Sequence, residues 1–242
     1  QSRYVTAHRN EVPDAFKGQI DLADHQKAAS YTVAKGLLNR VEGICGMIIL
    51  LLWTIGGGLA WLSESWQVLG WSAMTLGILF ILSFFVIGTL IDLPFSWYRT
   101  FVLEEKFGFN KNSPSLFLTD LIKQTVLMLI IGAPLLWGAL SLMDSAGEYW
   151  WLYLWAAWFA FTLLVMWAYP AFIAPLFNKF TPLEDIQLKE RVESLLSRCG
   201  FKSQGIFVMD GSRRSGHGNA YFTGLGGNKR IVFFDTLLET LN

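Results

Sequence analysis

Hydrophobic and polar positions divide the chain into three stretches of different character. Residues 1–42 mix polar and apolar positions, residues 43–177 are dominated by long apolar runs, and residues 178–242 alternate short apolar runs with polar turns. Long apolar runs favour helices that cross a membrane, whereas short runs between turns favour a small mixed domain. We therefore predict three parts with these boundaries.

The first stretch has the spacing of an amphipathic helix. Its apolar residues recur every four positions, at Ala29, Val33, Leu37 and Val41. Positions four apart lie on one face of a helix, and Asp21 has the side chain of an N-terminal cap. We expect this helix to pack on other helices or to lie at a membrane surface.

Four apolar runs in the second stretch approach or exceed the roughly 20 residues that cross a bilayer. They cover residues 43–62, 69–93, 121–143 and 149–172. Charged residues are nearly absent from them, with Asp92 and Lys123 close to run ends. Trp and Tyr gather at the connections, as in the aromatic belts of membrane proteins. The pattern predicts four transmembrane helices.

The distribution of Lys and Arg predicts the orientation of these helices. The connections at 63–68 and 144–148 contain neither residue, whereas residues 1–42 contain six and residues 94–123 contain four. Basic residues are retained on the cytoplasmic side. Both termini and the 94–120 loop are therefore predicted to be cytoplasmic, with the apolar spans in the lipid bilayer.

The third stretch predicts a small α+β unit. Thr181, Pro182 and Glu184 have the pattern of a helix start, with a cap, a first-turn proline and a capping-box acid. Three strand-like runs follow: "GIFVMDG", "NAYFTGLG" and "KRIVFFD". Asp235 is placed to cap a further helix. The fold class is mainly α: a multi-pass transmembrane helical bundle with a small cytoplasmic α+β unit at its C-terminal end.

Composition supports a membrane protein and narrows the chemistry. Hydrophobic residues make up 53% of the 242 residues and charged residues 16%, against about 25% in soluble domains. The formal net charge is zero, which gives no indication of nucleic-acid binding. The two Cys and three His have no metal-ligand spacing, and no H-E-x-x-H occurs.

Two other arrangements of functional side chains are weak. Glu104 and Glu105 are adjacent, so on a helix they point in different directions and make a poor acid–base pair. Ser212, Ser215 and His217 have no G-x-S-x-G elbow and no evident acid to orient the histidine. Neither a carboxylate pair nor a serine hydrolase is favoured.

Four long stretches are similar to a known family. Residues 25–35, 101–113, 169–185 and 215–241 resemble, in order, the integral-membrane zinc metalloproteases of the CAAX prenyl protease 1 family. The glycine-rich "GLGGNKR" resembles bacterial members, which implies a bacterial inner membrane; a eukaryotic member would lie in the endoplasmic reticulum. In eukaryotic members the substrate is a prenylated CAAX tail.

The resemblance places the metal chemistry outside this sequence. In the family a zinc ion is held by H-E-x-x-H and a later Glu, which we expect downstream of Asn242. Residues 178–242 are then an incomplete metalloprotease domain whose partner is a missing C-terminal part of the same protease. The resemblance implies no catalytic or metal-binding residue on this chain, and an inactive chain by itself.

The resemblance also implies a substrate-binding strand. In the family the "NAY" strand lies at a sheet edge, where substrate pairs with it as an added strand. The implied substrate-binding residues are His217, Gly218, Asn219, Ala220 and Tyr221. Two alternatives stay open: His217 as a surface residue, and Asn219 as a residue that caps a turn.

Two functions follow from these observations. The first is the membrane and substrate-edge portion of a zinc metalloendopeptidase that cleaves membrane-associated or CAAX-type peptides, or membrane proteins. The second is a non-catalytic membrane scaffold or a transporter-like bundle. Few charges lie within the spans, which argues against an ion pathway.

Overall fold

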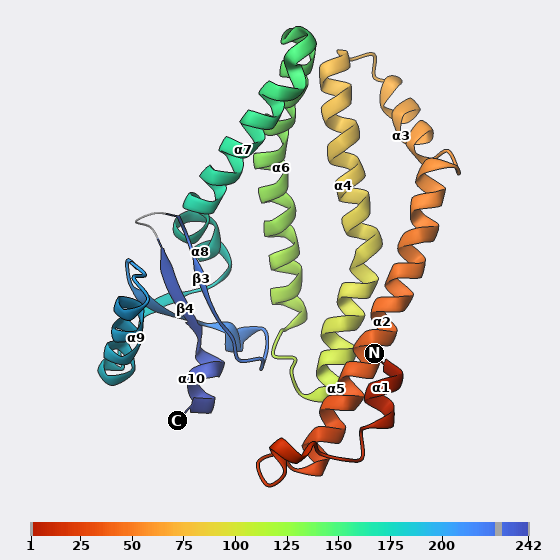
Figure 1. Cartoon of the computed structure of the whole chain (residues 1–242). Helices are drawn as coiled ribbons and strands as arrows, with labels where there is room; N and C mark the ends of the chain where they lie inside the picture. The colour runs from red at the N-terminus through yellow and green to blue at the C-terminus, as the bar shows by residue number, and fades with distance from the viewer. Residues whose placement is uncertain (1, 226–228, 242) are drawn as a thin grey trace. The chain divides into compact units, whose positions relative to one another are not determined.

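The structure, a computed structural model of the chain, describes residues 2–225 and 229–241 (Figure 1). Residues 1–110 form one compact unit and residues 111–242 a second. The sequence places a Gly-Asn turn between the runs "NAYFTGLG" and "KRIVFFD", and this turn lies outside the described residues.

The first unit is built of helices. Its elements are α1 (Ser2–Ala7), a 3-10 turn (Asp14–Phe16), α2 (Leu22–Thr54), α3 (Gly58–Gln67), α4 (Ala73–Tyr98), a π-helix (Arg99–Glu104) and α5 (Glu105–Phe107).

Helix α2 runs without a break across the predicted boundary between residues 42 and 43. The amphipathic segment and residues 43–54 of the first apolar run are therefore one helix, and the rest of the run 43–62 is divided between the glycine turn and α3. The helix stops at a glycine triplet, where Gly57 has a left-handed φ of 78°. A Cβ on Gly58 would lie 2.8 Å from the Trp53 ring. Apolar runs therefore locate the lipid-facing part of a helix but not its ends.

The predicted 94–120 loop is largely helical. Helix α4 continues through Pro94 and passes into the π-helix and α5. Leu103 and Phe107 on this extension pack with Leu38 of α2 in a buried cluster. Burial of these side chains explains why the polar "RTFVLEEKF" segment stays helical. Gly108, with φ of 80°, ends it.

The adjacent acids of this segment have separate partners. Glu104 accepts a hydrogen bond from the Tyr31 hydroxyl at 2.7 Å, and Glu105 accepts one from the Asn110 side chain at 2.9 Å. The two carboxylates therefore serve the packing of α2 and of the following turn, as the adjacency argument predicts.

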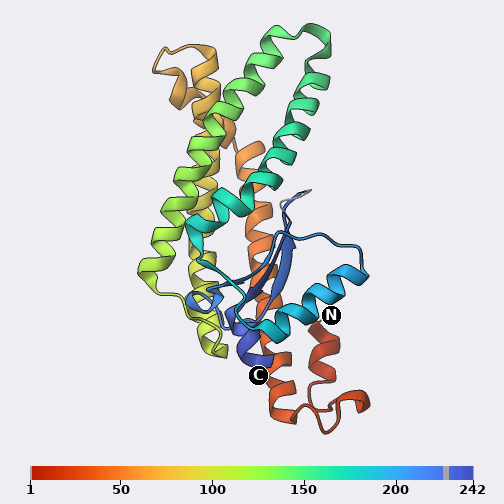
Figure 2. The same ribbon diagram turned by 90° about the vertical axis from the view of Figure 1, so that its left-hand side faces the viewer.

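The second unit combines two long helices with a sheet (Figures 1 and 2). Its elements are α6 (Pro114–Ser145), a 3-10 turn (Gly147–Tyr149), α7 (Trp150–Ala168), a π-helix (Tyr169–Ile173), α8 (Ala174–Phe177), β1 (Phe180–Pro182), α9 (Ile186–Arg198), β2 (Ile206–Met209), a 3-10 turn (Gly211–Arg213), β3 (Ala220–Thr223), β4 (Arg230–Phe234) and α10 (Asp235–Leu241).

Side chains cap two helices of this unit, one of them away from the predicted helix start. Ser113 caps α6 by accepting the Leu116 N–H, and Pro114 takes the first turn. Thr181 and Pro182, by contrast, lie in strand β1, and the cap of α9 is Asp185, whose side chain accepts the Leu188 N–H at 3.0 Å. Residues 181–184 match the capping-box pattern, but Thr181 and Pro182 pair with β2 as part of strand β1 and therefore do not begin the helix.

The sheet has four strands in the order β1-β2-β4-β3, one more than the sequence predicts. β1 pairs antiparallel with β2, β2 pairs parallel with β4, and β4 pairs antiparallel with β3. Val232, in the middle of β4, is 1% exposed and forms the centre of the small core. Helix α9 lies along one side of the sheet (Figure 2).

Among the described residues, four helical segments are long and apolar enough to cross a membrane. They cover Leu22–Thr54, Ala73–Phe107, Pro114–Ser145 and Gly147–Phe177, and at most 11% of their apolar windows is buried in the protein. Large apolar side chains such as Leu50 and Trp155 are more than 60% exposed. Such surface is costly in water and favourable in lipid, so the chain is a multi-pass membrane protein.

Candidate functional site

Strand β3 lies at one end of the sheet order, as the resemblance implies. Its partner on one side is β4, with Ala220 opposite Phe233 and Tyr221 opposite Val232. The other side has no neighbour among the described strands. Main-chain groups on that side are therefore available to an added strand.

The register decides which residues face the open side. The Phe234 N–H donates to the Asn219 carbonyl at 2.9 Å, which makes this a hydrogen-bonded pair. Antiparallel pairs alternate, so the Tyr221–Val232 pair is hydrogen-bonded and the Ala220 and Phe222 pairs are not. The N–H and C=O groups of Ala220 and Phe222 thus point away from β4.

Phe222 is the residue that sequence reasoning missed. The resemblance points to three consecutive residues, but only alternate residues present main-chain groups to the open side. The Asn219 carbonyl and the Tyr221 main chain are used in the sheet, whereas the Phe222 main chain points to the open side and its side chain, which contacts Phe201, is 72% exposed. The alternation rule finds Phe222 once the pairing with β4 is known.

The opposite edge of the sheet, strand β1, suits an added strand less well. The Leu183 N–H donates to the Ile206 carbonyl, so by the same alternation Phe180 and Pro182 turn their main-chain groups outward. Proline has no N–H to offer an added strand. Within β1 only Phe180 therefore presents an outward donor, whereas β3 has two outward N–H groups.

The side chain of Asn219 covers the first of these donors. Its Oδ1 accepts the Ala220 N–H at 2.8 Å. This contact fits the alternative in which Asn219 caps local backbone. An incoming strand that pairs with Ala220 has to displace the amide, which is exposed and moves without disturbing the core.

Tyr221 packs its side chain on the sheet. Its hydroxyl lies 3.8 Å from the Met209 sulfur, and its ring meets Phe234 edge to face at 6.1 Å. Burial, followed by the nearby Tyr169 phenol, raises the pKa of Tyr221 above its ordinary value. The phenol stays neutral at physiological pH and serves packing.

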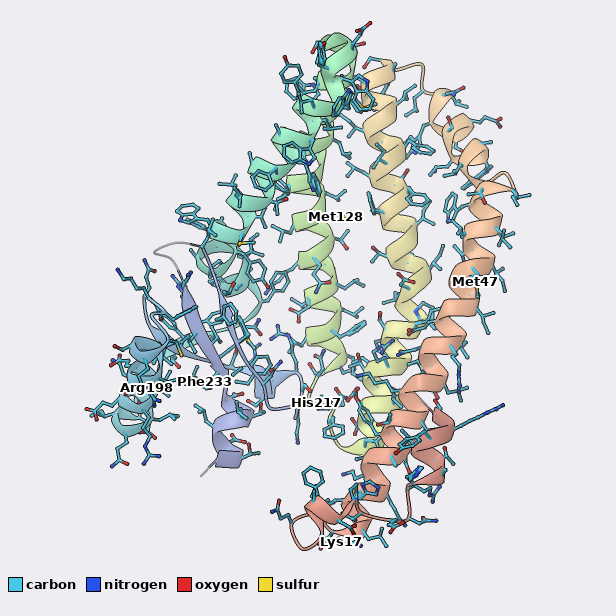
Figure 3. The ribbon with its side chains drawn as sticks, viewed as in Figure 1. Lys17, Met47, Met128, Arg198, His217 and Phe233 are labelled. Atoms are coloured by element: carbon cyan, nitrogen blue, oxygen red, sulfur yellow. The ribbon has the colours of Figure 1, made fainter. Side chains whose placement is uncertain are left out.

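Gly218 and His217 lie on the segment that leads into β3. A Cβ on Gly218 would come within 3.2 Å of the Leu237 Cα, so the absence of a side chain permits contact with α10. The His217 carbonyl accepts the Thr236 hydroxyl at 2.9 Å, and its N–H donates to Ser215. His217 is exposed on this segment (Figure 3). The structure thus brings all five predicted residues into one continuous edge segment.

A metal site needs several ligands in one place. Within residues 2–225 and 229–241, no group of three or more His, Cys, Asp or Glu side chains could hold a metal ion. The residues present therefore do not fit a zinc ion, and the chemistry available to this edge is main-chain pairing.

Comparison with known proteins identifies both parts of the chain. Residues 1–179 match the family described as CAAX prenyl protease N-terminal, five membrane helices. Residues 182–242 match peptidase family M48.

Named relatives agree with this assignment. CAAX prenyl protease 1 of Saccharomyces cerevisiae is 39% identical over 98% of this chain and 55% of its own length. The human homologue is 34% identical over 99% of this chain and 52% of its own length. This chain therefore spans about half the length of these curated relatives. Both are eukaryotic, so they give no support to the predicted bacterial inner membrane.

A solved structure has the same fold. The crystal structure of S. mikatae Ste24p superposes with a TM-score of 0.87 at 38% identity, and the match covers 99% of this chain and 58% of that one. With matches along nearly its whole length, this chain belongs to the CAAX prenyl protease 1 family of membrane proteases, its last 61 residues falling in peptidase family M48.

Proposed function

We propose that this chain supplies the membrane helices and the substrate-pairing edge of a zinc metalloendopeptidase. The substrate we propose is a peptide held at the membrane, in particular a prenylated CAAX tail. The names of the relatives support this choice of substrate. Because those relatives are eukaryotic, we propose the endoplasmic reticulum as the membrane.

The open edge of β3 carries the proposal. An added strand receives and donates hydrogen bonds at Ala220 and Phe222, and so is held extended beside the sheet. Main-chain pairing is indifferent to substrate side chains, which suits a protease that selects its substrate by a lipid group and position at the membrane. Small Ala220 leaves room for the approach.

The proposed role of this chain is to bind and orient the peptide. The zinc that the family implies has no ligand cluster among the described residues, and H-E-x-x-H is absent from the sequence. We therefore assign no bond-breaking step to these residues. Residues 1–242 alone are expected to hold no zinc and to cleave no peptide.

Ala220→Pro in the intact protease tests the edge. Proline removes the outward N–H, so the KM for a prenylated peptide should rise about tenfold, the effect of losing one hydrogen bond and fixing φ. Zinc content and thermal stability should stay near wild type because the Ala220 N–H is outside the β3–β4 ladder.

Ala220→Ser is the matched control, since it keeps the N–H and a small side chain. Its KM should stay within about twofold of wild type, as expected for a surface substitution. Equal KM values for the proline variant and wild type would contradict the edge role. An intact protein that binds no zinc would instead favour the scaffold or transporter-like bundle.

A further inference from the structure

Arg214 contacts three other residues of the second unit through its guanidinium. Its Nε and Nη2 donate to the two carboxylate oxygens of Asp120 at 2.7 and 3.1 Å. Nη2 also donates to the Phe177 carbonyl at 2.6 Å, and Nη1 donates to the Asn178 side chain at 2.8 Å. A guanidinium that makes a bidentate contact with a carboxylate is held in one orientation.

The partners of Arg214 lie on other elements of the same unit. Asp120 is in the second turn of α6 and is only 8% exposed, and Phe177 is the last residue of α8. Arg214 itself is on the segment between β2 and β3, five residues ahead of Asn219. One side chain therefore joins the approach to the edge strand to the ends of two helices.

The Phe177 contact is one of three that the structure describes from cations to carbonyls of residues 170–177. Lys123 of α6 donates to the Leu176 carbonyl at 2.9 Å, and Arg230 of β4 donates to the Pro170 carbonyl at 2.9 Å. The last carbonyls of a helix have no partner within it and carry partial negative charge. Arg214 and Lys123 satisfy such carbonyls at the end of α8, whereas Arg230 contacts the start of the π-helix.

The approach segment is also held at its other side by α10. Asp235 accepts the Ser212 N–H at 2.8 Å, and the Thr236 hydroxyl donates to the His217 carbonyl at 2.9 Å. The Arg214 carbonyl accepts the Lys111 N–H at 3.2 Å. Hydrogen bonds to α10 on one side and to Asp120 on the other hold residues 211–218, which we call the strap. Strand β3 begins two residues after the strap ends.

We propose that Arg214 is a positioning residue, which acts through the strap to hold the β3 edge in place for an incoming peptide. The proposal rests on the pairing role of β3 proposed above. It predicts that loss of the Arg214–Asp120 pair loosens the strap and the edge, and so weakens peptide binding more than it slows the bound peptide's cleavage. If Arg214 served stability alone, Arg214→Ala would lower the melting temperature without weakening peptide binding more than it slows cleavage.

Hydrogen exchange on the intact protease measures the strap directly. In Arg214→Ala, amide exchange in residues 211–223 should rise about tenfold or more, since hydrogen bonds to charged groups are the strong ones. Arg213→Ala is the matched control: Arg213 is adjacent, its side chain is 46% exposed, and it forms a surface ion pair with nearby Asp210. Its exchange should equal that of wild type.

Kinetics on a prenylated peptide separate positioning from stability. Arg214→Ala should raise KM about tenfold, as expected for a lost charged contact, with kcat changed less and zinc content unchanged. Asp120→Asn, which removes the partner's charge but keeps its shape, should give a smaller shift in the same direction. The KM of Arg214→Lys should lie between those of wild type and Arg214→Ala, because an ammonium group cannot reproduce the bidentate contact.

Three results would overturn the proposal. They are unchanged exchange in 211–223 for Arg214→Ala, raised exchange with an unchanged KM, and global unfolding of the mild variant Asp120→Asn. If the intact wild-type protein has no peptidase activity, the proposed function is wrong. The difference in amide exchange between Arg214→Ala and Arg213→Ala would still test whether Arg214 holds residues 211–218 in place.

Discussion

At the scale of single residues, Gly218 shows how closely the edge segment is packed. A methyl group there would lie 3.2 Å from the Leu237 Cα and 3.4 Å from its Cβ. The contact is with backbone as well as side chain, so α10 or the strap has to shift. Overpacking of this kind costs about 1–3 kcal/mol.

Gly218→Ala should therefore lower the melting temperature of the detergent-solubilised protein. The control is Gly138→Ala in α6, where a Cβ meets nothing within 4 Å. Alanine in a helix interior is favoured over glycine, so this variant should be neutral or slightly stabilising. Equal melting temperatures for the two variants would show that the strap has more room than the structure gives it.

At the residue scale, the resemblance implies that the "NAY" residues lie at a sheet edge but not which of them face outward, and their substrate-binding role stays a prediction. The order of strands places Ala220 at an edge, as the resemblance implies. Asn219 and Tyr221 direct main-chain groups toward β4, whereas Phe222 directs its main-chain groups outward. This alternation depends on the register with β4, a long-range property that the sequence "NAYFTG" does not contain. The Arg214 network is missed for the same reason, since Asp120 is 94 residues away.

At the scale of elements, α9 offers a direct test between two candidate caps. The sequence pattern favours Thr181 with Glu184, whereas in the structure Asp185 accepts the Leu188 N–H. Asp185→Ala should cost about 1 kcal/mol, the usual value for a lost N-terminal cap. Thermal unfolding, or exchange of the first amides of α9, measures this cost.

Glu184→Gln is the control for that measurement, because it removes the charge of the pattern's capping-box residue and leaves the structural cap intact. It should change stability by less than about 0.5 kcal/mol, as expected for a surface position. If Glu184→Gln lowered stability more than Asp185→Ala does, the result would favour the helix start at Thr181 that the sequence pattern predicts.

Element types are predicted more reliably than element ends. Apolar runs locate the lipid-facing parts of all four long helices, because lipid exposure needs continuous hydrophobic surface. The extension of α4 through Pro94 and the continuity of α2 come from contacts between Leu38 and Leu103, which no local pattern reveals. Strand β1 is three residues long and is formed only by pairing with β2.

At the scale of the whole molecule, the distribution of Lys and Arg predicts which end of each helix is cytoplasmic. The turn between α6 and α7 has Asp144 and Glu148 but no basic residue, whereas the sheet region carries nine basic residues. We predict that this turn and the sheet lie on opposite sides of the membrane. Native Cys199, which is exposed, reports on the sheet side.

Cysteine labelling in sealed vesicles measures this orientation. In a Cys45→Ser background, Cys199 should react only with a reagent that reaches the cytoplasmic side. Ser145→Cys, combined with Cys199→Ser, should react only with a reagent on the other side. Labelling of both positions from the same side would contradict the predicted orientation of α6.

We propose that the whole protease holds its peptide substrate by pairing it with the open edge of β3. Within β3, Ala220 and Phe222 are the residues that turn main-chain groups to the open side, so a paired peptide uses every second residue of its own backbone. Methylation of a peptide nitrogen removes one donor and obstructs pairing at that residue. The effect along the peptide should therefore alternate.

The decisive measurement is a scan of singly N-methylated prenylated peptides against the intact protease. Pairing predicts a period of two, with KM raised about tenfold, the effect of one lost hydrogen bond and a steric clash, at alternate positions and little changed between them. In Ala220→Pro the alternation should weaken at the peptide residue that pairs with Ala220. A scan with no alternation, or one identical in wild type and Ala220→Pro, would contradict pairing with β3.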